Sequence, residues 1–468
     1  MRTYHIFMNI TVNKKISSKL CIFTSNTQNL SAHFLVLRAP KMKVDIISSE
    51  LIKPSSPTPS EFRDFKLSFL DERIPPTYVP LIFYYSQNES TSNIKQSHMS
   101  NILKESLSQA LTQFYPLAGR MKGQISVDCS DEGVCYVEAQ VDSELTDIIE
   151  CSEAKVFDQL IPYKIESVKE ELAIQVTFFS CGGIVVGMCI SHRIADGCTL
   201  CTFIKAWAAT ARGERNTVCP IFNLSSLFPP RDSPDFMPVT NHPAIRPPTQ
   251  RVVTKRFVFT ASGIAALKSE LVKTNSNMLL PTRVEAVSAL IWKCCIAATR
   301  RKNCSVSVAF HPVNFRKRMD PPLPENSFGN IFQMASAVTS GETDLGSLVG
   351  KLRGAIGKID GDYIRKLQGE DGFDIVRNNF KEIGKLLSQG DVQVLRFSSW
   401  CGFPIYEADF GWGNPTWVSS ASFSNIDSIK LMDSRGVGGI EAWVILAEED
   451  MMEFEKDVEL QLYTTLSS

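Results

Sequence analysis

Residues 172–211 read LAIQVTFFSCGGIVVGMCISHRIADGCTLCTFIKAWAATA and combine two apolar runs with an amphipathic segment. The apolar runs, 173–179 and 184–191, are rich in β-branched and aromatic residues and flank a Gly-Gly pair, a pattern typical of two strands joined by a tight turn. The uncharged stretch approaches the length of a membrane-spanning helix, but the paired glycines favour the hairpin. A helix is predicted over 197–211.

His192 lies between the second predicted strand and this helix, a position where folds expose side chains for chemistry. The ordinary pKa of imidazole suits proton transfer near neutral pH. Asp196 can cap the N-terminus of the helix. The alternative interpretation is a structural histidine in a turn with a capping aspartate, and the spacing H-x-x-x-D-G alone does not decide between the two.

The chain contains no G-x-S-x-G nucleophile motif and no phosphate-binding motif of the G-x-x-x-x-G-K-[ST] or G-x-G-x-x-G kind. His192 therefore has no obvious nucleophilic partner within the protein. A base without a protein nucleophile favours direct transfer, in which the hydroxyl group of a substrate attacks.

A second distinctive segment runs from Phe397-Ser-Ser-Trp400 to Ala408-Asp-Phe-Gly-Trp-Gly413. Two glycines around a tryptophan predict a tight loop whose backbone passes close to another group. Asp409 in this loop is either a second catalytic carboxylate or a structural residue that pairs or caps.

The length of 468 residues predicts more than one domain. Strand and helix patterns alternate on both sides of a segment with seven prolines, 223–252, which favours an extended crossover. We therefore predict a mixed α/β (α+β) fold with an N-terminal domain over 42–222 and a C-terminal domain over 253–468. Further helices are predicted at 98–114, 261–273, 283–299 and 449–461, and further strands at 124–127, 135–139, 256–259, 306–310, 392–400 and 440–447.

Residues 1–41 differ from the rest because they contain no Asp or Glu and six Lys or Arg. One interpretation is a plastid or mitochondrial transit peptide, which is basic and poor in acids. The other, which we favour, is an over-extended start with Met42 as the true first residue. Accordingly we expect a cytoplasmic protein, or a plastid protein if the extension is genuine.

The composition of the chain limits the classes of partner and of metal site that are expected. Lys and Arg total 49 against 50 Asp and Glu, a net charge of −1, so neither a nucleic-acid nor an anionic-membrane partner is expected. The 13 cysteines lie mostly in apolar runs, which predicts reduced, buried thiols. A lone C-x-x-C at 198–201 lacks a second ligand pair, so we expect no metal site.

Taken together, these residues resemble the plant BAHD acyltransferase family. His192, Asp196 and Gly197 match its H-x-x-x-D-G motif, and Asp409 to Gly413, with Gly411 and Trp412, match D-F-G-W-G. The resemblance extends over nearly all of 42–468 and includes the segments 54–59, 114–120 and 313–324. It is strongest to members that acetylate polycyclic alkaloids and terpenoids such as limonoids.

The resemblance implies two similar-sized domains of the chloramphenicol-acetyltransferase-like type with a channel between them. His192 is then the general base on the acceptor hydroxyl, and Ser398 and Trp400 are weaker candidates for contact with the substrate or its oxyanion. Asp196 points away from the channel and supports the turn together with Gly197. For Asp409 we hypothesise an ion pair with Arg316, so that Arg316, Gly411, Trp412 and Gly413 are expected to be structural.

The activity expected from the resemblance is transfer of an acetyl group from acetyl-CoA, as co-substrate, to a hydroxyl group of an alkaloid or terpenoid. No bound cofactor is expected. The expected partners are an acyl-CoA and a small-molecule alcohol, both as substrates, and the protein is expected to be a monomer. A larger donor, such as a hydroxycinnamoyl- or malonyl-CoA, and a non-enzymatic ligand-binding protein on the same fold remain the alternatives.

Overall fold

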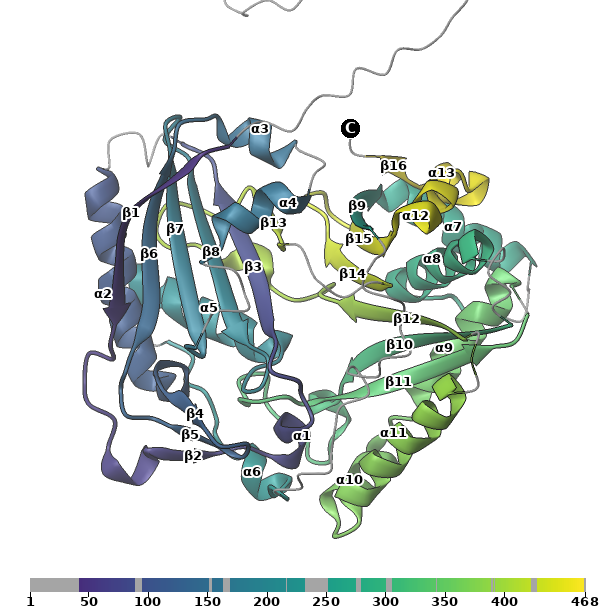
Figure 1. Ribbon diagram of the computed structural model, residues 1–468, viewed down its shortest axis with the longest axis horizontal. Coiled ribbons are helices and arrows are strands. Elements are labelled where there is room, and N and C mark those ends of the chain that lie inside the picture. The colour runs from purple at the N-terminus through teal and green to yellow at the C-terminus, as the bar shows by residue number, and fades with distance from the viewer. Residues whose placement is uncertain are drawn as a thin grey trace, which may run out of the picture. The chain divides into compact units, whose positions relative to one another are not determined.

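The computed structural model in Figure 1 describes the residues from 42 onward apart from a few internal gaps. The expectations for 1–41, and for the greater part of the crossover, lie outside the described residues. The described ranges are 42–88, 95–150, 154–162, 169–215, 217–231, 251–274, 279–299, 305–341, 343–388, 390, 392–421 and 427–466.

The first half of the chain builds a sheet in the order β1-β6-β7-β8-β3-β13. The apolar stretch quoted above forms its centre, since β7 and β8 are an antiparallel hairpin that turns at Gly182, where φ is +80°. Both strands are buried along their whole length, which explains the continuous apolar runs. The bounds are β1 Val44–Ile52, β3 Tyr78–Tyr85, β6 Val134–Val141, β7 Leu172–Phe179, β8 Ile184–Ser191 and β13 Trp417–Ser419.

Two helices, α2 (Gln96–Gln113) and α5 (Gly197–Ala211), cover one face of this sheet (Figure 1). They pack on each other, and the buried Trp207 indole of α5 donates to the Leu103 carbonyl of α2 at 3.2 Å. A smaller sheet in the order β2-β5-β4 lies beside them. The remaining elements are β2 Asp64–Lys66, α1 Phe69–Glu72, β4 Arg120–Lys122, β5 Ser126–Asp128, α3 Leu145–Ile149, α4 Ala154–Phe157 and α6 Leu224–Leu227.

The second half builds a sheet in the order β11-β10-β12-β14-β15-β9-β16. Helices α8, α9 and α12 supply buried residues to the core on one of its faces. The bounds are β9 Val252–Phe259, α7 Ala261–Thr274, α8 Arg283–Thr299, β10 Val306–Asn314, β11 Phe332–Thr339, α9 Leu345–Gly357, α10 Gly361–Gln368, α11 Gly372–Ser388, β12 Val392–Ser399, β14 Ser428–Asp433, β15 Ile440–Ala447, α12 Glu448–Glu455, α13 Val458–Tyr463 and β16 Thr465–Leu466.

The mixed class of strands and helices predicted from sequence is confirmed, and helices α5 and α8 have the predicted bounds. The single final helix predicted over 449–461 is wrong. Two helices stand there, because Asp457 caps the second one and accepts from the amides of Glu459 at 2.9 Å and Leu460 at 3.1 Å.

The short strand β13 crosses from one half of the sequence to the sheet of the other. It pairs with β3, with Trp417 opposite Tyr84 and Ser419 opposite Ile82. Both sheets lie within one unit of the chain, Ala39–Ser468. A strand of three residues carries no readable period, so its position is decided by tertiary packing.

The cysteines that the structure describes are free thiols, most of them buried. Cys198 of the C-x-x-C segment donates to the Glu325 carbonyl at 3.3 Å, and Cys201 is buried in the core. Among the described helices, none is both long enough and apolar enough to cross a membrane.

Candidate active site

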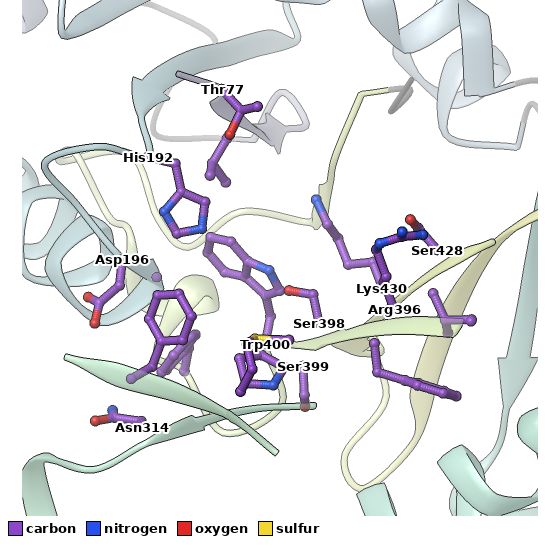
Figure 2. A pocket seen from close by; sticks show the side chains of 18 of the residues that line it. Thr77, His192, Asp196, Asn314, Arg396, Ser398, Ser399, Trp400, Ser428 and Lys430 are labelled. Atoms are coloured by element: carbon purple, nitrogen blue, oxygen red, sulfur yellow. The ribbon is translucent and has the colours of Figure 1, made fainter. Parts of the chain in front are cut away.

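A cavity of about 320 Å³ lies where the two sheets meet (Figure 2). Its wall is formed by residues after β8, at the start of β3, and along β10, β11, β12 and β14. The sequence-predicted residues that line it are His192, Asp196, Gly197, Ser398 and Trp400.

The backbone and side chain of His192 are both fixed. Its amide donates to the Thr77 carbonyl at 2.8 Å, and its Nδ1 lies 3.1 Å from Asn330 Oδ1. The Asn330 amide nitrogen donates to Asp71 Oδ1 at 2.9 Å and to the His192 carbonyl at 2.8 Å. The amide oxygen must therefore face the imidazole, which assigns the proton to Nδ1. Nε2 is left as a basic atom in the cavity wall.

Three consecutive backbone amides hold Asn330 in this position. The amide of Gly329 donates to Thr199 Oγ1 at 3.1 Å, that of Asn330 to Asp71 Oδ1 at 2.8 Å, and that of Ile331 to Asp196 Oδ2 at 3.0 Å. All three acceptors come from the first half of the chain. Gly329 has a φ of +121°, and a Cβ there would stand 2.5 Å from Leu224 Cδ2, so a glycine is required.

Asp71 and Asn330 were missed by the sequence interpretation. They are 259 residues apart, and neither belongs to a motif. The one local signal is Ser68 followed three residues later by an acid, which predicts a capping box at α1. This pattern identifies Asp71 as a capping residue but does not indicate that Asp71 is linked to His192 through Asn330.

Asn330→Ala tests the positioning of the imidazole. Without the amide oxygen the ring can take the other tautomer or rotate, so we expect kcat to fall by about 10²-fold while KM for acetyl-CoA changes little. The measurement is steady-state kinetics, with Asn326→Ala as control, because the Asn326 side chain donates to the exposed loop carbonyl of Cys219, away from the imidazole. A variant with unchanged kcat would show that Asn330 does not position the base.

Burial is the main influence on the His192 imidazole and lowers its pKa below 6.5, although hydrogen bonds and the Asp196 carboxylate act in the opposite direction. The group is therefore neutral, and able to accept a proton, at neutral pH.

The acid limb of the pH profile checks this state. Because a lowered pKa means that protonation requires a lower pH, the acid limb of kcat/KM should have its midpoint below pH 6.5. The measurement is kcat/KM across pH at constant ionic strength. An acid limb centred above pH 6.5 would contradict the assignment.

Asp196 and Arg316 form a buried ion pair beneath the site. Arg316 Nη1 donates to Asp196 Oδ2 at 2.7 Å and Nη2 to Oδ1 at 3.0 Å, and the two side chains are 1% and 7% exposed. Asp196 also caps α5, accepting from the Thr199 amide at 2.8 Å. Burial alone would raise the pKa of Asp196, but the charge and hydrogen bonds of Arg316, with those of two backbone amides, hold it below its ordinary value.

The hypothesised ion pair between Asp409 and Arg316 is wrong. Arg316 begins the turn after β10, and that turn lies against the N-terminus of α5, where Asp196 takes both of its terminal nitrogens. The carboxylate of Asp409 instead accepts from the amides of Gly411 and Gly413, each at 2.8 Å.

The loop of Asp409 is held together locally and is docked on β3. Gly411 and Gly413 have φ values of +111° and +99°, conformations that side chains rarely adopt. The Trp412 carbonyl accepts from Asn88 Nδ2 at 2.8 Å, and the Trp412 ring packs edge-on against Tyr85. Asp409 is not among the residues that line the cavity. We propose on these contacts that Asp409 is structural.

Two substitutions separate the roles of Asp409. Asp409→Ala leaves two loop amides without their acceptor and should lower the free energy of unfolding by about 1–3 kcal/mol. Asp409→Asn keeps an acceptor oxygen and should be close to the parent protein. The measurements are urea unfolding and kcat per folded molecule. If Asp409→Ala abolishes turnover without loss of stability, the carboxylate is catalytic.

Ser398 lies near the end of β12 and Trp400 directly follows that strand, and both line the cavity. Trp400 is buried, and the Lys430 ammonium nitrogen stands 5.7 Å from the centre of its ring. Both residues therefore belong to the wall that faces a substrate in the cavity.

The family model described as "Transferase family" matches residues 42–461. The chain is 39% identical to stemmadenine O-acetyltransferase of Catharanthus roseus, over 92% of this chain and 100% of that protein. It is 39% identical to limonoid 7-O-acetyltransferase of Citrus sinensis, over 91% and 99%. The crystal structure of vinorine synthase superposes with a TM-score of 0.77 at 35% identity, covering 91% of this chain and 100% of the other.

Proposed function

Since this chain belongs to the BAHD transferase family, we propose that it transfers an acetyl group from acetyl-CoA to a hydroxyl group of a polycyclic plant specialised metabolite. The observation that carries the proposal is a partly buried, neutral imidazole, held at Nδ1 by Asn330, in the wall of a cavity formed by both sheets. The 39% identity to two O-acetyltransferases favours acetyl over a larger acyl group.

The reaction needs one proton acceptor and no protein nucleophile. His192 Nε2 takes the proton of the acceptor hydroxyl as its oxygen attacks the thioester carbonyl. The tetrahedral intermediate then breaks its carbon–sulfur bond, and the imidazolium returns the proton to the departing thiolate. The products are an acetyl ester and free CoA.

The oxyanion of that intermediate requires hydrogen-bond donors, each worth about 3–4 kcal/mol of transition-state stabilisation. Ser398 is our candidate, since its hydroxyl lies on the cavity face of β12. Trp400 stands two residues on and shapes the same wall. Asp196, paired with Arg316, maintains the turn and takes no proton.

We propose that the enzyme is a cytoplasmic monomer and that its substrates are two small molecules. The near-zero net charge of −1 supports the expectation of neither a nucleic acid nor an anionic membrane as partner.

Incubation of the purified protein with labelled acetyl-CoA and a panel of polycyclic alcohols tests the proposal. We expect CoA release that depends on the acceptor, and an acetyl ester identifiable by mass spectrometry. Malonyl-CoA and a hydroxycinnamoyl-CoA serve as rival donors. If the folded protein binds alcohols but releases no CoA with any donor, it is a ligand-binding protein on this fold.

A further inference from the structure

One wall of the cavity carries two nitrogen-bearing side chains, Arg396 and Lys430, to which the proposed chemistry assigns no role. Strands β12 and β14 run parallel there, with Arg396 opposite Ser428 and Ser398 opposite Lys430. Arg396, Ser428 and Lys430 all line the cavity. Figure 2 shows these three side chains gathered together, with Trp400 next to Lys430.

Arg396 is partly buried and remains positively charged, as arginine does in proteins. Its backbone amide donates to the Asp427 carbonyl at 2.9 Å. In the part of the chain that the structure describes, no hydrogen bond or ion pair reaches its guanidinium group. Five donors in a planar fork thus border the cavity, a geometry suited to a carboxylate.

Lys430 is 6% exposed and is oriented by its surroundings. Its Nζ donates to Ser420 Oγ at 2.6 Å, and Ser420 in turn donates to the Pro80 carbonyl at 2.8 Å. Burial lowers the pKa of Lys430 well below its ordinary value, and even the neutral amine has two hydrogens, so it can make this bond and still donate to a ligand. The register places Lys430 two residue pairs further along the strands than Arg396.

Acidic side chains are nearly absent from the described lining of this cavity. Among the described residues that line it, Asp196 alone has a carboxylate, and both of its oxygens accept from Arg316. Asp427, whose charge acts on Arg396, is buried and does not line the cavity. A protonated amine would therefore meet the Arg396 cation and no available carboxylate, while an anionic oxygen would meet several donors.

We propose that Arg396, Ser428 and Lys430 form a carboxylate-binding subsite for the acyl acceptor. The acceptor is then an acidic polycyclic alcohol rather than a protonated alkaloid base. This inference rests on the proposed acetyl transfer and names the substrate class of the same site. Arg396 grips the carboxylate with two parallel hydrogen bonds, and Lys430 and Ser428 add donors beside it.

Three steroid alcohols with one ring system test the subsite: a carboxylic acid, its methyl ester and the corresponding primary amine. The parent protein should acetylate the acid with the lowest KM and the amine with the highest. Arg396→Gln should raise KM for the acid by about tenfold and leave KM for the ester unchanged. The matched control is Arg365→Gln on α10, where the arginine is 64% exposed and pairs with Asp362.

Two further variants keep the result interpretable. Arg396→Lys retains a charge and should recover part of the preference for the acid. Lys430→Met introduces an apolar side chain of similar length and should also raise KM for the acid. Circular dichroism identifies any variant that fails to fold.

Equal KM for acid and ester in the parent protein would overturn the subsite. It would also be overturned if Arg396→Gln impaired malonyl-CoA with the ester acceptor and left the acid unaffected, since the carboxylate would then belong to the donor. Acetylation of the ester preserves the proposed function in either case. If none of the three alcohols is acetylated, calorimetric titration still tests the subsite, because it compares binding of the acid with binding of the ester.

Discussion

His192→Ala should lower kcat by about 10²–10⁴-fold, because it removes the one side chain placed to accept the hydroxyl proton. The change should leave the surrounding backbone intact. The His192 amide donates to Thr77 and its carbonyl accepts from Asn330, and neither bond involves the imidazole. KM for acetyl-CoA should therefore change little, and acetyl-CoA should still bind in calorimetric titration.

The matched control is His98→Ala, since His98 is exposed on α2 and does not line the cavity. Added imidazole offers a second readout, because a small base that enters the vacated space should restore part of the turnover. Should His192→Ala retain more than a tenth of the parental kcat, a different group or water must accept the proton.

Arg316→Met should cost about 3–5 kcal/mol of unfolding free energy, the largest stability loss that we expect from a single change here. It leaves the Asp196 carboxylate buried without its counter-charge, and desolvation then outweighs the remaining bonds from Thr199 and Ile331. Urea unfolding followed by circular dichroism measures the loss. Turnover should also fall, since the Ile331 amide on Asp196 helps to place the neighbouring Asn330.

The same pair contributes a pH-dependent part of the stability. The pKa of Asp196 is lowered in the folded state, so its contribution is present above the unfolded pKa and is lost as pH falls through the folded value. Arg316→Met should therefore have a lower free energy of unfolding than the parent protein at neutral pH. As pH falls, its free energy of unfolding should decrease by less than that of the parent protein.

Lys317→Met is the control for this prediction, because Lys317 neighbours Arg316 in sequence and pairs with Glu325 at 2.8 Å on the surface. Little change is expected, as exposed ion pairs are screened by water. The double variant Asp196→Asn with Arg316→Met removes both charges and should be more stable than Arg316→Met alone. If it is not, the loss comes from packing of the arginine and not from the unpaired carboxylate.

Much of the local structure could be predicted because its causes lie within a few residues. The hairpin β7–β8 follows from two apolar runs around Gly182 and Gly183, and α5 follows from its apolar spacing after the Asp196 cap. The strand-to-helix junction then places His192 at a turn, which in the structure borders the cavity. The two motifs together indicated the family, which the match over residues 42–461 confirms.

The elements of the second half were harder to predict. Strands β11 and β14 and helices α9 to α11 went unassigned, and β13 joins a sheet built almost entirely from the other half of the chain. Edge and short strands are determined by the neighbour they pair with, and that neighbour is distant in sequence.

By itself, then, the sequence determined the hairpin, the capped helix and the histidine between them, since each depends on periodicity and turn chemistry within one segment. Tertiary structure decided which partners these residues take. Arg316 reaches Asp196 across 120 residues and Asn330 reaches His192 across 138, while Arg396 and Lys430 face one cavity because β12 and β14 pair in register. Such contacts follow from the packing of whole sheets, and no local pattern encodes which distant side chain will fill the space beside a buried charge.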